Sequence, residues 1–175
     1  MLKSRLCIAF FAFAVGCAPA QKPLTDYVNP MLGTATLWDS VDLGFKPTKR
    51  TWGAEVFPGS ALPNAMVQVS PVTKFHSGAG YQYEDSVIYG FTHTNKGHWN
   101  LCHIPLLPVT GTPTPGDYCS PFSHERESAA PGYYQVFLDR YGVDAQLSST
   151  LRCAFHKYTY PAGAAPAVLA DPVSY

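Results

Sequence analysis

GYYQVFLD (132–139) and VDAQLSS (143–149) flank the short connection Arg140-Tyr141-Gly142. Tyrosine, phenylalanine and valine favour the pleated surface of a strand. A three-residue connection that ends in glycine is typical of a β-hairpin, because glycine accepts the backbone conformation that closes such a turn. This stretch therefore predicts two paired antiparallel strands, and the rest of the chain is interpreted around them.

Further strands are predicted on both sides of this hairpin. They cover 65–70, 81–83, 87–91, 104–109, 152–160 and 167–170. Two prolines in 104–109 predict an edge strand or a bulge, since proline cannot donate to a strand ladder. The chain holds 16 Pro and 14 Gly, and no helix longer than two turns is patterned. The fold class is therefore all-β, an antiparallel β-sandwich, which we expect to be incomplete at its carboxy terminus because the strand at 167–170 has no successor.

The first twenty residues have the pattern of an export signal. Two basic residues in Met1–Arg5 precede an apolar run from Leu6 to Val15, and small residues follow. The run is too short to span a bilayer as a helix. We therefore expect residues 1–20 to be a signal peptide and residues 21–175 to work outside the cytosol, in the periplasm or at the outer-membrane surface. The sequence leaves open whether Cys17 carries a lipid anchor or cleavage follows Ala20.

Charge and cysteine content exclude some classes of function. Lys and Arg number 12, Asp and Glu number 12, and the net charge is +0, so the chain has no electrostatic basis for binding nucleic acid. Cys102, Cys119 and Cys153 allow three pairings, and the sequence does not choose among them. None of them has the C-x-x-C spacing of a structural zinc site.

A polar, aromatic loop at 92–100 is the richest candidate for binding a sugar. It contains Asn95, His98 and Trp99. An indole packs on the C–H face of a pyranose, while amide and imidazole groups bind its hydroxyls. The alternative is that Trp99 and His98 only close the core after a strand. His93 lies beside a strand end, and we expect a structural hydrogen-bonding role for it.

Two other segments are weaker candidates. Arg50 and Trp52 lie in a long loop at 35–55 without strand or helix periodicity, and loops of this length in a compact domain are often functional. Capping of the core by Trp52 is the alternative. Gly80 ends a Gly-Ala-Gly segment where the backbone can approach a ligand or another strand closely.

The sequence predicts no catalytic residue. Hydrolysis by general acid–base catalysis needs two carboxyl groups beside the bond that breaks, one protonated and one ionised. The candidates within the chain are Glu84, Asp85, Glu125 and Glu127. The first two are adjacent in a turn, and the other two flank an arginine in a loop that we expect to be solvated. We also expect no metal site formed by His93, His98, His103 and His124, because the spacing of five between the first three suits neither a helix face nor a strand pair.

Six ordered motifs resemble one known family. They are Val28–Thr34, Phe57–Ser60, Met66–Pro71, Gly80–Tyr83, Gly90–Thr94 and the run from Phe122–Glu125 through Pro131–Tyr134. From Tyr27 onward the chain resembles the amino-terminal β-sandwich domain of glycoside hydrolase family 92, the exo-α-mannosidases. The resemblance implies a galactose-mutarotase-like supersandwich.

The resemblance also implies an activity and partners. Family members remove terminal α-linked mannose with inversion, depend on calcium, and hold the active site between this sandwich and a larger helical carboxy-terminal domain. That domain, with the general acid, general base and calcium ligands, is absent from this sequence, so no calcium ligand is identified here. Mannose-containing glycans are the implied ligands, and the fragment alone is expected to be inactive.

The resemblance places Lys74 and Trp99 where family members contact mannose. The family commonly has an acidic residue and an arginine where this chain has Val72 and Lys74, and Phe-Gly where it has Asn64-Ala65. Lysine is a point charge and does not reproduce the fork of an arginine, which implies a different linkage or leaving-group preference. The competing interpretations are a stand-alone carbohydrate-binding module and an inactive gene fragment. The predicted substrate-binding residues are Arg50, Lys74, Gly80, Asn95, His98 and Trp99.

Overall fold

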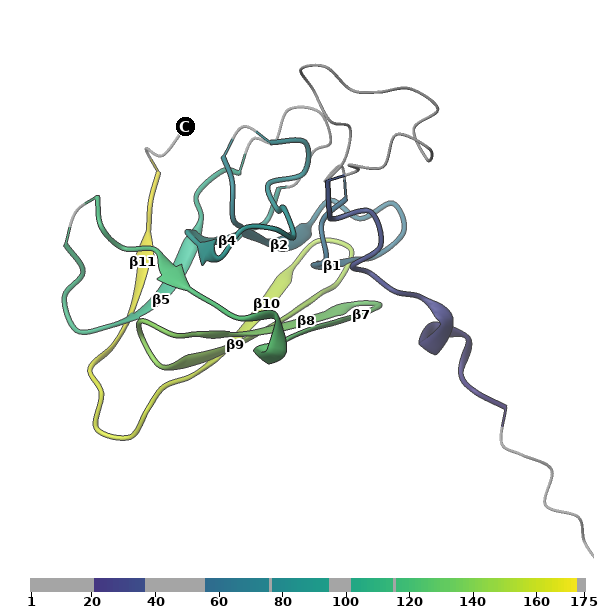
Figure 1. Ribbon diagram of the computed structural model, residues 1–175. Coiled ribbons are helices and arrows are strands. Elements are labelled where there is room, and N and C mark those ends of the chain that lie inside the picture. Colours follow the sequence, from purple (N-terminus) through teal and green to yellow (C-terminus); the bar gives the residue numbers. More distant parts are fainter. Residues whose placement is uncertain (1–20, 37–55, 76, 95–101, 115, 173–175) are drawn as a thin grey trace, which may run out of the picture.

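The computed structural model describes residues 21–36, 56–75, 77–94, 102–114 and 116–172, and they form two main antiparallel sheets (Figure 1). The first sheet has the order β1 (Ser60–Ala61), β2 (Gln68–Val72), β4 (Gly90–Thr92), β5 (Leu106–Thr110), β11 (Pro166–Ala170). The second has the order β10 (Ala154–Thr159), β9 (Val143–Ser149), β8 (Tyr133–Leu138), β7 (Glu127–Ala130). A small sheet pairs β3 (Val87–Ile88) with β6 (Ser120–Pro121). The predicted all-β, antiparallel class is confirmed.

Two short 3₁₀ turns are the helical elements of the described residues, η1 (Leu24–Tyr27) and η2 (His124–Arg126). Every residue of η1 is exposed, and Figure 1 shows its segment extending away from the sheets. Within the described part of the chain, no helix has the length and hydrophobicity needed to cross a membrane.

The hairpin that the sequence predicted is formed by β8 and β9. Its register ends with Leu138 opposite Val143, and Gly142 donates its N–H to the Leu138 carbonyl at 2.9 Å. Gly142 has φ 64°, the left-handed conformation that favours glycine. Asp139 leaves the ladder and donates its N–H to the Pro121 carbonyl at 3.0 Å. The connection therefore has four residues and not the predicted three.

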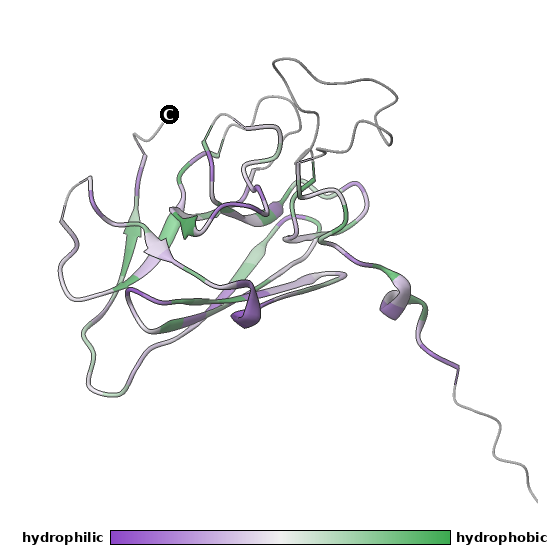
Figure 2. Ribbon diagram, viewed as in Figure 1, coloured by the Kyte–Doolittle hydropathy of each residue, from purple (hydrophilic) through white to green (hydrophobic). Residues whose placement is uncertain are grey.

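Alternation along β8 and β9 builds half of the core. Every second residue is buried, which places Tyr134, Val136 and Leu138 of β8 on the same face as Val143, Ala145 and Leu147 of β9. From the five-stranded sheet, Val69, Phe91, Leu107 and Val109 complete this core. Figure 2 shows the hydrophobic residues gathered along β5, β10 and β11. The two sheets thus bury their facing sides against each other, as the faces of a sandwich do.

The predicted strand with two prolines, at 104–109, is not an edge strand, so that alternative of the prediction is wrong. β5 lies between β4 and β11. It pairs with β4 at one register position, Phe91 with Leu106. On its other side the Gly111 N–H donates to the Ala165 carbonyl, and the Asp171 N–H donates to the Pro105 carbonyl. In this antiparallel register the N of Pro108 points away from β11 and toward β4. The missing N–H of Pro108 therefore falls where the β4 pairing has already ended.

Two other predicted strands differ from the observed ones. β2 starts at Gln68, three residues later than predicted, because Asn64 has φ 59° and the Met66 N–H donates to the Leu151 carbonyl at 2.8 Å instead of joining a ladder. The predicted strand at 81–83 does not form. There the Tyr83 N–H donates to the Thr34 carbonyl at 3.1 Å, which ties this segment to the amino-terminal region.

Candidate functional site

The structure brings two of the predicted sugar-contacting residues, Lys74 and Gly80, together in one turn after β2. The N–H groups of Thr73 and Lys74 both donate to the Gly80 carbonyl, at 2.8 and 3.2 Å. Ser77 closes the turn, because its Oγ accepts from the Gly80 N–H at 2.9 Å and donates to the Lys74 carbonyl at 2.9 Å. Gly80 has φ 77°, so a side chain at this position would be strained.

A chain of hydrogen bonds links Lys74 to the segment that precedes residue 37. The Lys74 Nζ donates to Gln82 Oε1 at 3.2 Å, and Gln82 Nε2 donates to Thr36 Oγ1 at 3.2 Å. The Thr36 N–H in turn donates to Glu84 Oε1 at 2.7 Å. An ammonium, an amide, a hydroxyl and a carboxylate therefore follow one another along the surface, and these groups bind sugar hydroxyls as donors and acceptors.

The carboxyl group of Glu84 is not suited to be a general acid. Burial tends to raise its pKa, but hydrogen bonds from Thr36 and Gln82 outweigh burial, and the net pKa of Glu84 is lowered. A group with a lowered pKa is ionised at neutral pH and has no proton to give to a leaving group. Its neighbour Asp85 accepts a hydrogen bond from Thr73 Oγ1 at 2.9 Å. The two adjacent carboxylates thus have different partners.

Glu127 corrects the sequence interpretation, which expected a solvated loop residue. It begins β7, and its side chain is 0% exposed. Its carboxylate accepts from the Tyr134 hydroxyl at 2.5 Å and from the Tyr81 hydroxyl at 3.0 Å, and lies 2.5 Å from His124 Nδ1. Burial, followed by the Glu127 charge, raises the pKa of Tyr81 and of Tyr134. This carboxylate is a buried structural group.

Four of the six predicted sugar-contacting residues, Arg50, Asn95, His98 and Trp99, lie outside the described residues, as does Trp52. Residues on the carboxy-terminal side of the 95–101 segment are placed: the His103 N–H donates to Thr94 Oγ1 at 3.3 Å, and Thr92 Oγ1 donates to the His103 carbonyl at 3.2 Å. Contact of Arg50, Asn95, His98 and Trp99 with a sugar stays a prediction.

The histidines that the sequence grouped as possible metal ligands have separate partners. His93 Nε2 lies 2.8 Å from His156 Nε2, which gives His93 the hydrogen-bonding role that the sequence predicted. His124 Nε2 lies 2.7 Å from the Tyr83 carbonyl. In the described ranges, no three His, Cys, Asp or Glu side chains form a group able to hold a metal ion. The described ranges also contain no disulfide between Cys102, Cys119 and Cys153.

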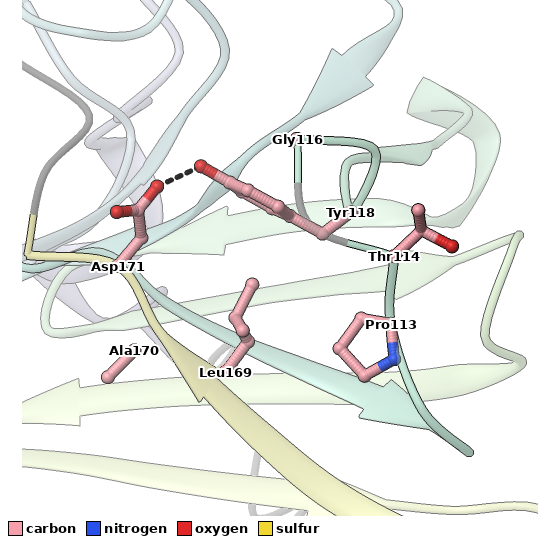
Figure 3. A pocket seen from close by; sticks show the side chains of 7 residues that line it. All are labelled: Pro113, Thr114, Gly116, Tyr118, Leu169, Ala170 and Asp171. Carbon is pink, nitrogen blue, oxygen red and sulfur yellow. Dashed lines mark hydrogen bonds between the residues drawn. The ribbon is translucent and has the colours of Figure 1, made fainter.

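Two pockets lie away from the Lys74 turn. One, of about 260 Å³, is lined by Pro113, Thr114, Gly116, Tyr118, Leu169, Ala170 and Asp171 (Figure 3). The Tyr118 hydroxyl donates to Asp171 across its mouth. The other, of about 330 Å³, is lined by Glu125, Arg126, Glu127, Ser128, Gln135, Phe137 and Asp144. Neither Lys74 nor Gly80 lines either of these two pockets, so the sequence did not point to them.

Sequence reasoning missed Thr36, Gln82 and the buried Glu127. Thr36 carries no motif, and Gln82 lies in the Gly80–Tyr83 motif but was not selected as a site residue. The two meet only through tertiary structure over a separation of 46 residues. Glu127 did leave a signal. It opposes Val136 in the β7–β8 register, so the alternation of β8 extended onto β7 places it on the buried face.

Comparison with known proteins agrees with this fold. A family model described as the glycosyl hydrolase family 92 N-terminal domain matches residues 27–175. Among solved structures, a family GH92 α-mannosidase from Bacteroides thetaiotaomicron in complex with mannoimidazole is 32% identical, with a TM-score of 0.65 over 80% of this chain. A family GH92 inverting mannosidase from the same species is 28% identical, with a TM-score of 0.64 over 86% of this chain. The matched regions are 18% and 20% of those two proteins. No curated protein sequence matches.

Proposed function

This chain belongs to glycoside hydrolase family 92 as its amino-terminal domain, and we propose that it forms one wall of the mannose pocket of an exported, calcium-dependent inverting exo-α-mannosidase. The observation that carries the proposal is the family match over residues 27–175, together with the surface chain of polar groups from Lys74 through Gln82 to Thr36. The substrates would be mannose-containing glycans.

Within this proposal Lys74 binds a sugar hydroxyl and Gln82 orients it. The ammonium of Lys74 has three donors, and one of them is used by Gln82 Oε1 at 3.2 Å. Two donors are left for hydroxyl oxygens of a ligand. Because an ammonium is a point charge, it tolerates several hydroxyl geometries where an arginine fork selects one. We therefore expect a broader linkage preference than an arginine would give.

The reacting carboxyl groups belong to polypeptide beyond this chain in our proposal. Three of the four described candidates are engaged elsewhere: Glu84 with Thr36, Asp85 with Thr73, and Glu127 with tyrosines and a histidine. The fourth, Glu125, is exposed. Calcium does not fit the described residues either, since carbonyl and carboxylate oxygens must converge on it in numbers of about six to eight. The partner of this domain is the helical catalytic domain, which would supply the acid, the base and the calcium ligands.

The export signal at residues 1–20, with cleavage after Ala20 or lipid attachment at Cys17, belongs to the same proposal, and with it a location in the periplasm or at the outer-membrane surface. A carbohydrate-binding module without hydrolysis is the second candidate function, favoured by the engagement of the described carboxylates. The two differ in mannose release from an aryl α-mannoside by the full-length gene product, which the first candidate predicts and the second does not. For the chain alone with calcium present, both predict no release. Release above a no-protein blank would contradict both.

The sugar-contact role of Lys74 is tested in the full-length gene product. Lys74→Ala should raise KM for an aryl α-mannoside about tenfold, because one charge-assisted hydrogen bond contributes about 1.5 kcal/mol. Lys22→Ala is the matched control, since Lys22 lies on the exposed segment before the sandwich and contacts Tyr27. Unchanged KM and kcat in Lys74→Ala would remove this residue from the pocket wall.

A further inference from the structure

The outward face of the β7–β10 sheet carries an ordered set of planar polar and aromatic side chains. On β8 the residues between the buried ones are Tyr133, Gln135 and Phe137, and their partners across the ladder are Ser148, Gln146 and Asp144 of β9. Beyond β9, the β10 residues Phe155, Lys157 and Thr159 continue the same rows. This face points away from the core between the two sheets.

Two amides hold the carboxylate of Asp144 in a fixed orientation. Gln135 Nε2 donates to Asp144 Oδ1 at 2.7 Å, and Gln146 Nε2 donates to Asp144 Oδ2 at 2.7 Å. The Tyr133 hydroxyl donates to Gln135 Oε1 at 3.0 Å, which fixes that amide in turn. Each amide keeps a second N–H, and each Asp144 oxygen keeps a further lone pair. Because hydrogen bonds already hold these side chains in place, their free donors and acceptors are ordered before a ligand binds. This lowers the entropic cost of binding.

Aromatic side chains flank this polar row at both ends. Tyr133 and Phe155 lie on either side of Ser148, and Phe155 is 63% exposed. At the other end Phe137 is covered by the Arg126 guanidinium, 4.1 Å from its ring centre. Exposed aromatic rings pack against the C–H face of a sugar ring, while amides and carboxylates bind its hydroxyls.

The charge of Asp144 favours a neutral sugar at its carboxylate, while Lys157 of β10 and Arg126 over Phe137 carry positive charge elsewhere on the same face. In the described part of the chain, the partners of the Asp144 carboxylate are neutral amides and no ion pair offsets the charge. An anionic ligand would be repelled at this position. The adjoining pocket, about 330 Å³, is at the small end of the range for ligand sites and suits a single ring.

We propose that this face is a second carbohydrate-binding surface, which holds one neutral pyranose ring of a glycan on Gln135, Asp144 and Gln146, with Tyr133 and Phe155 at one end of this polar set and Phe137 at the other. It does not depend on the pocket wall around Lys74, because all of its residues belong to the other sheet. Such a surface would keep an enzyme near a polymeric glycan by adding a second attachment, which raises the effective concentration of the substrate.

The test is a titration of the isotope-labelled chain with methyl α-mannoside, followed by amide NMR. We expect saturable shifts in the side-chain amide signals of Gln135 and Gln146. The double variant Gln135→Ala/Gln146→Ala, followed through the backbone amide signals of β8 and β9, should bind at least tenfold more weakly, because it removes two hydrogen-bonding groups of about 1 kcal/mol each. Phe155→Ala should weaken binding on its own, and its exposed side chain makes loss of folding an implausible cause.

Two controls separate this surface from the Lys74 turn. Lys74→Ala should leave the shifts of Gln135 and Gln146 unchanged. The sodium salt of glucuronic acid, an anionic sugar, should shift them less than methyl α-mannoside does. Shifts confined to the Lys74–Gln82 segment would overturn the second surface and leave the proposed function standing. An absence of saturable shifts on the β7–β10 face, or equal binding by the double variant, would also overturn it.

Discussion

The two main sheets of this domain are built on different principles. The sheet of β7–β10 consists of four to seven residues per strand, joined in chain order by hairpins, and its burial alternates residue by residue. The sheet of β1, β2, β4, β5 and β11 combines short strands from distant parts of the chain, and β1 has two residues. The first depends on local pattern. The second depends on close contacts across the chain, so single substitutions should affect the two sheets differently.

The largest effect is expected at Gly59, which precedes β1. An alanine Cβ at this position would lie 2.0 Å from the Val69 carbonyl oxygen and 2.6 Å from the Ser70 Cα. Backbone atoms cannot move aside as a side chain does, so Gly59→Ala should destabilise the domain by more than about 4 kcal/mol. Urea unfolding measures the change.

Gly132→Ala, in the turn between β7 and β8, is the comparison for this variant. Gly132 has φ 77° and no heavy atom within 4 Å of an added Cβ, so the substitution changes conformational strain and not packing. Its cost should be about 1 kcal/mol. Equal losses for the two variants would show that the sheets do not differ in this respect.

Glu127 is a carboxylate on the buried face of the four-stranded sheet, and its removal should have the next largest effect. Glu127→Gln replaces an acceptor of two tyrosine hydroxyls with an amide and leaves His124 without its carboxylate. Breaking such a buried pair on one side should cost about 3 kcal/mol. Glu125→Gln, two residues earlier and exposed, should not change the unfolding midpoint. A midpoint that Glu127→Gln leaves unchanged would contradict the structural role.

The His93–His156 contact joins the two sheets and should make stability depend on pH. Burial, followed by the charge of His93, lowers the pKa of His156 to about 4, and burial lowers the pKa of His93. In the unfolded chain the two histidines become protonated near pH 6.5, whereas in the folded protein they become protonated only at lower pH. Stability contributed by the neutral pair is therefore present above pH 6.5 and lost as pH falls toward 4.

The measurement for this pair is the unfolding free energy of the wild type and of His156→Gln from pH 7 to pH 4. Because the rings are partly exposed, the difference between the two pH profiles should be about 1 kcal/mol. Tyr158, whose hydroxyl lies 2.7 Å from His156 Nδ1, stays neutral over this range, since burial raises its pKa. Parallel profiles would show that the contact between the sheets does not titrate.

The smallest effect is expected for the ion pair of Asp117 and Arg140 on the surface between the sheets. Arg140 donates to both oxygens of Asp117, at 2.7 and 3.0 Å, and these hydrogen bonds lower the pKa of Asp117. Exposed pairs of this kind are screened by water and salt. Asp117→Asn should therefore leave the melting temperature within experimental error. A clear loss would make this pair part of the structural framework.

The difference between the sheets also explains what could be predicted from the sequence. The β8–β9 hairpin was predicted because its signals, strand-forming residues and Gly142, are local. The position of β5 was not, because Pro105 and Pro108 of the predicted strand indicate an edge or a bulge, whereas Pro108 is accommodated inside the sheet by the early end of the β4 pairing. The residues around Pro108 in the sequence do not indicate where the pairing with β4 ends.

The candidate site divides in the same way. Lys74 and Gly80 were predicted, and their shared turn needs only the local contacts of Ser77. Gln82 and Thr36 were missed because their contact is made by folding and not by spacing. Asp144 and its two amides lie on the outward positions of regular strands, where the sequence shows the face but not which side chains pair.

The pairing of β5 with β11 has a consequence for folding. Leu106–Thr110 pairs with Pro166–Ala170, which is synthesised after all four strands of the other sheet. The hairpins can therefore assemble early, whereas the five-stranded sheet is completed by a late, long-range closure of the kind that slows folding. The pairing of β11 with β5 is therefore the step that delays completion of the sandwich.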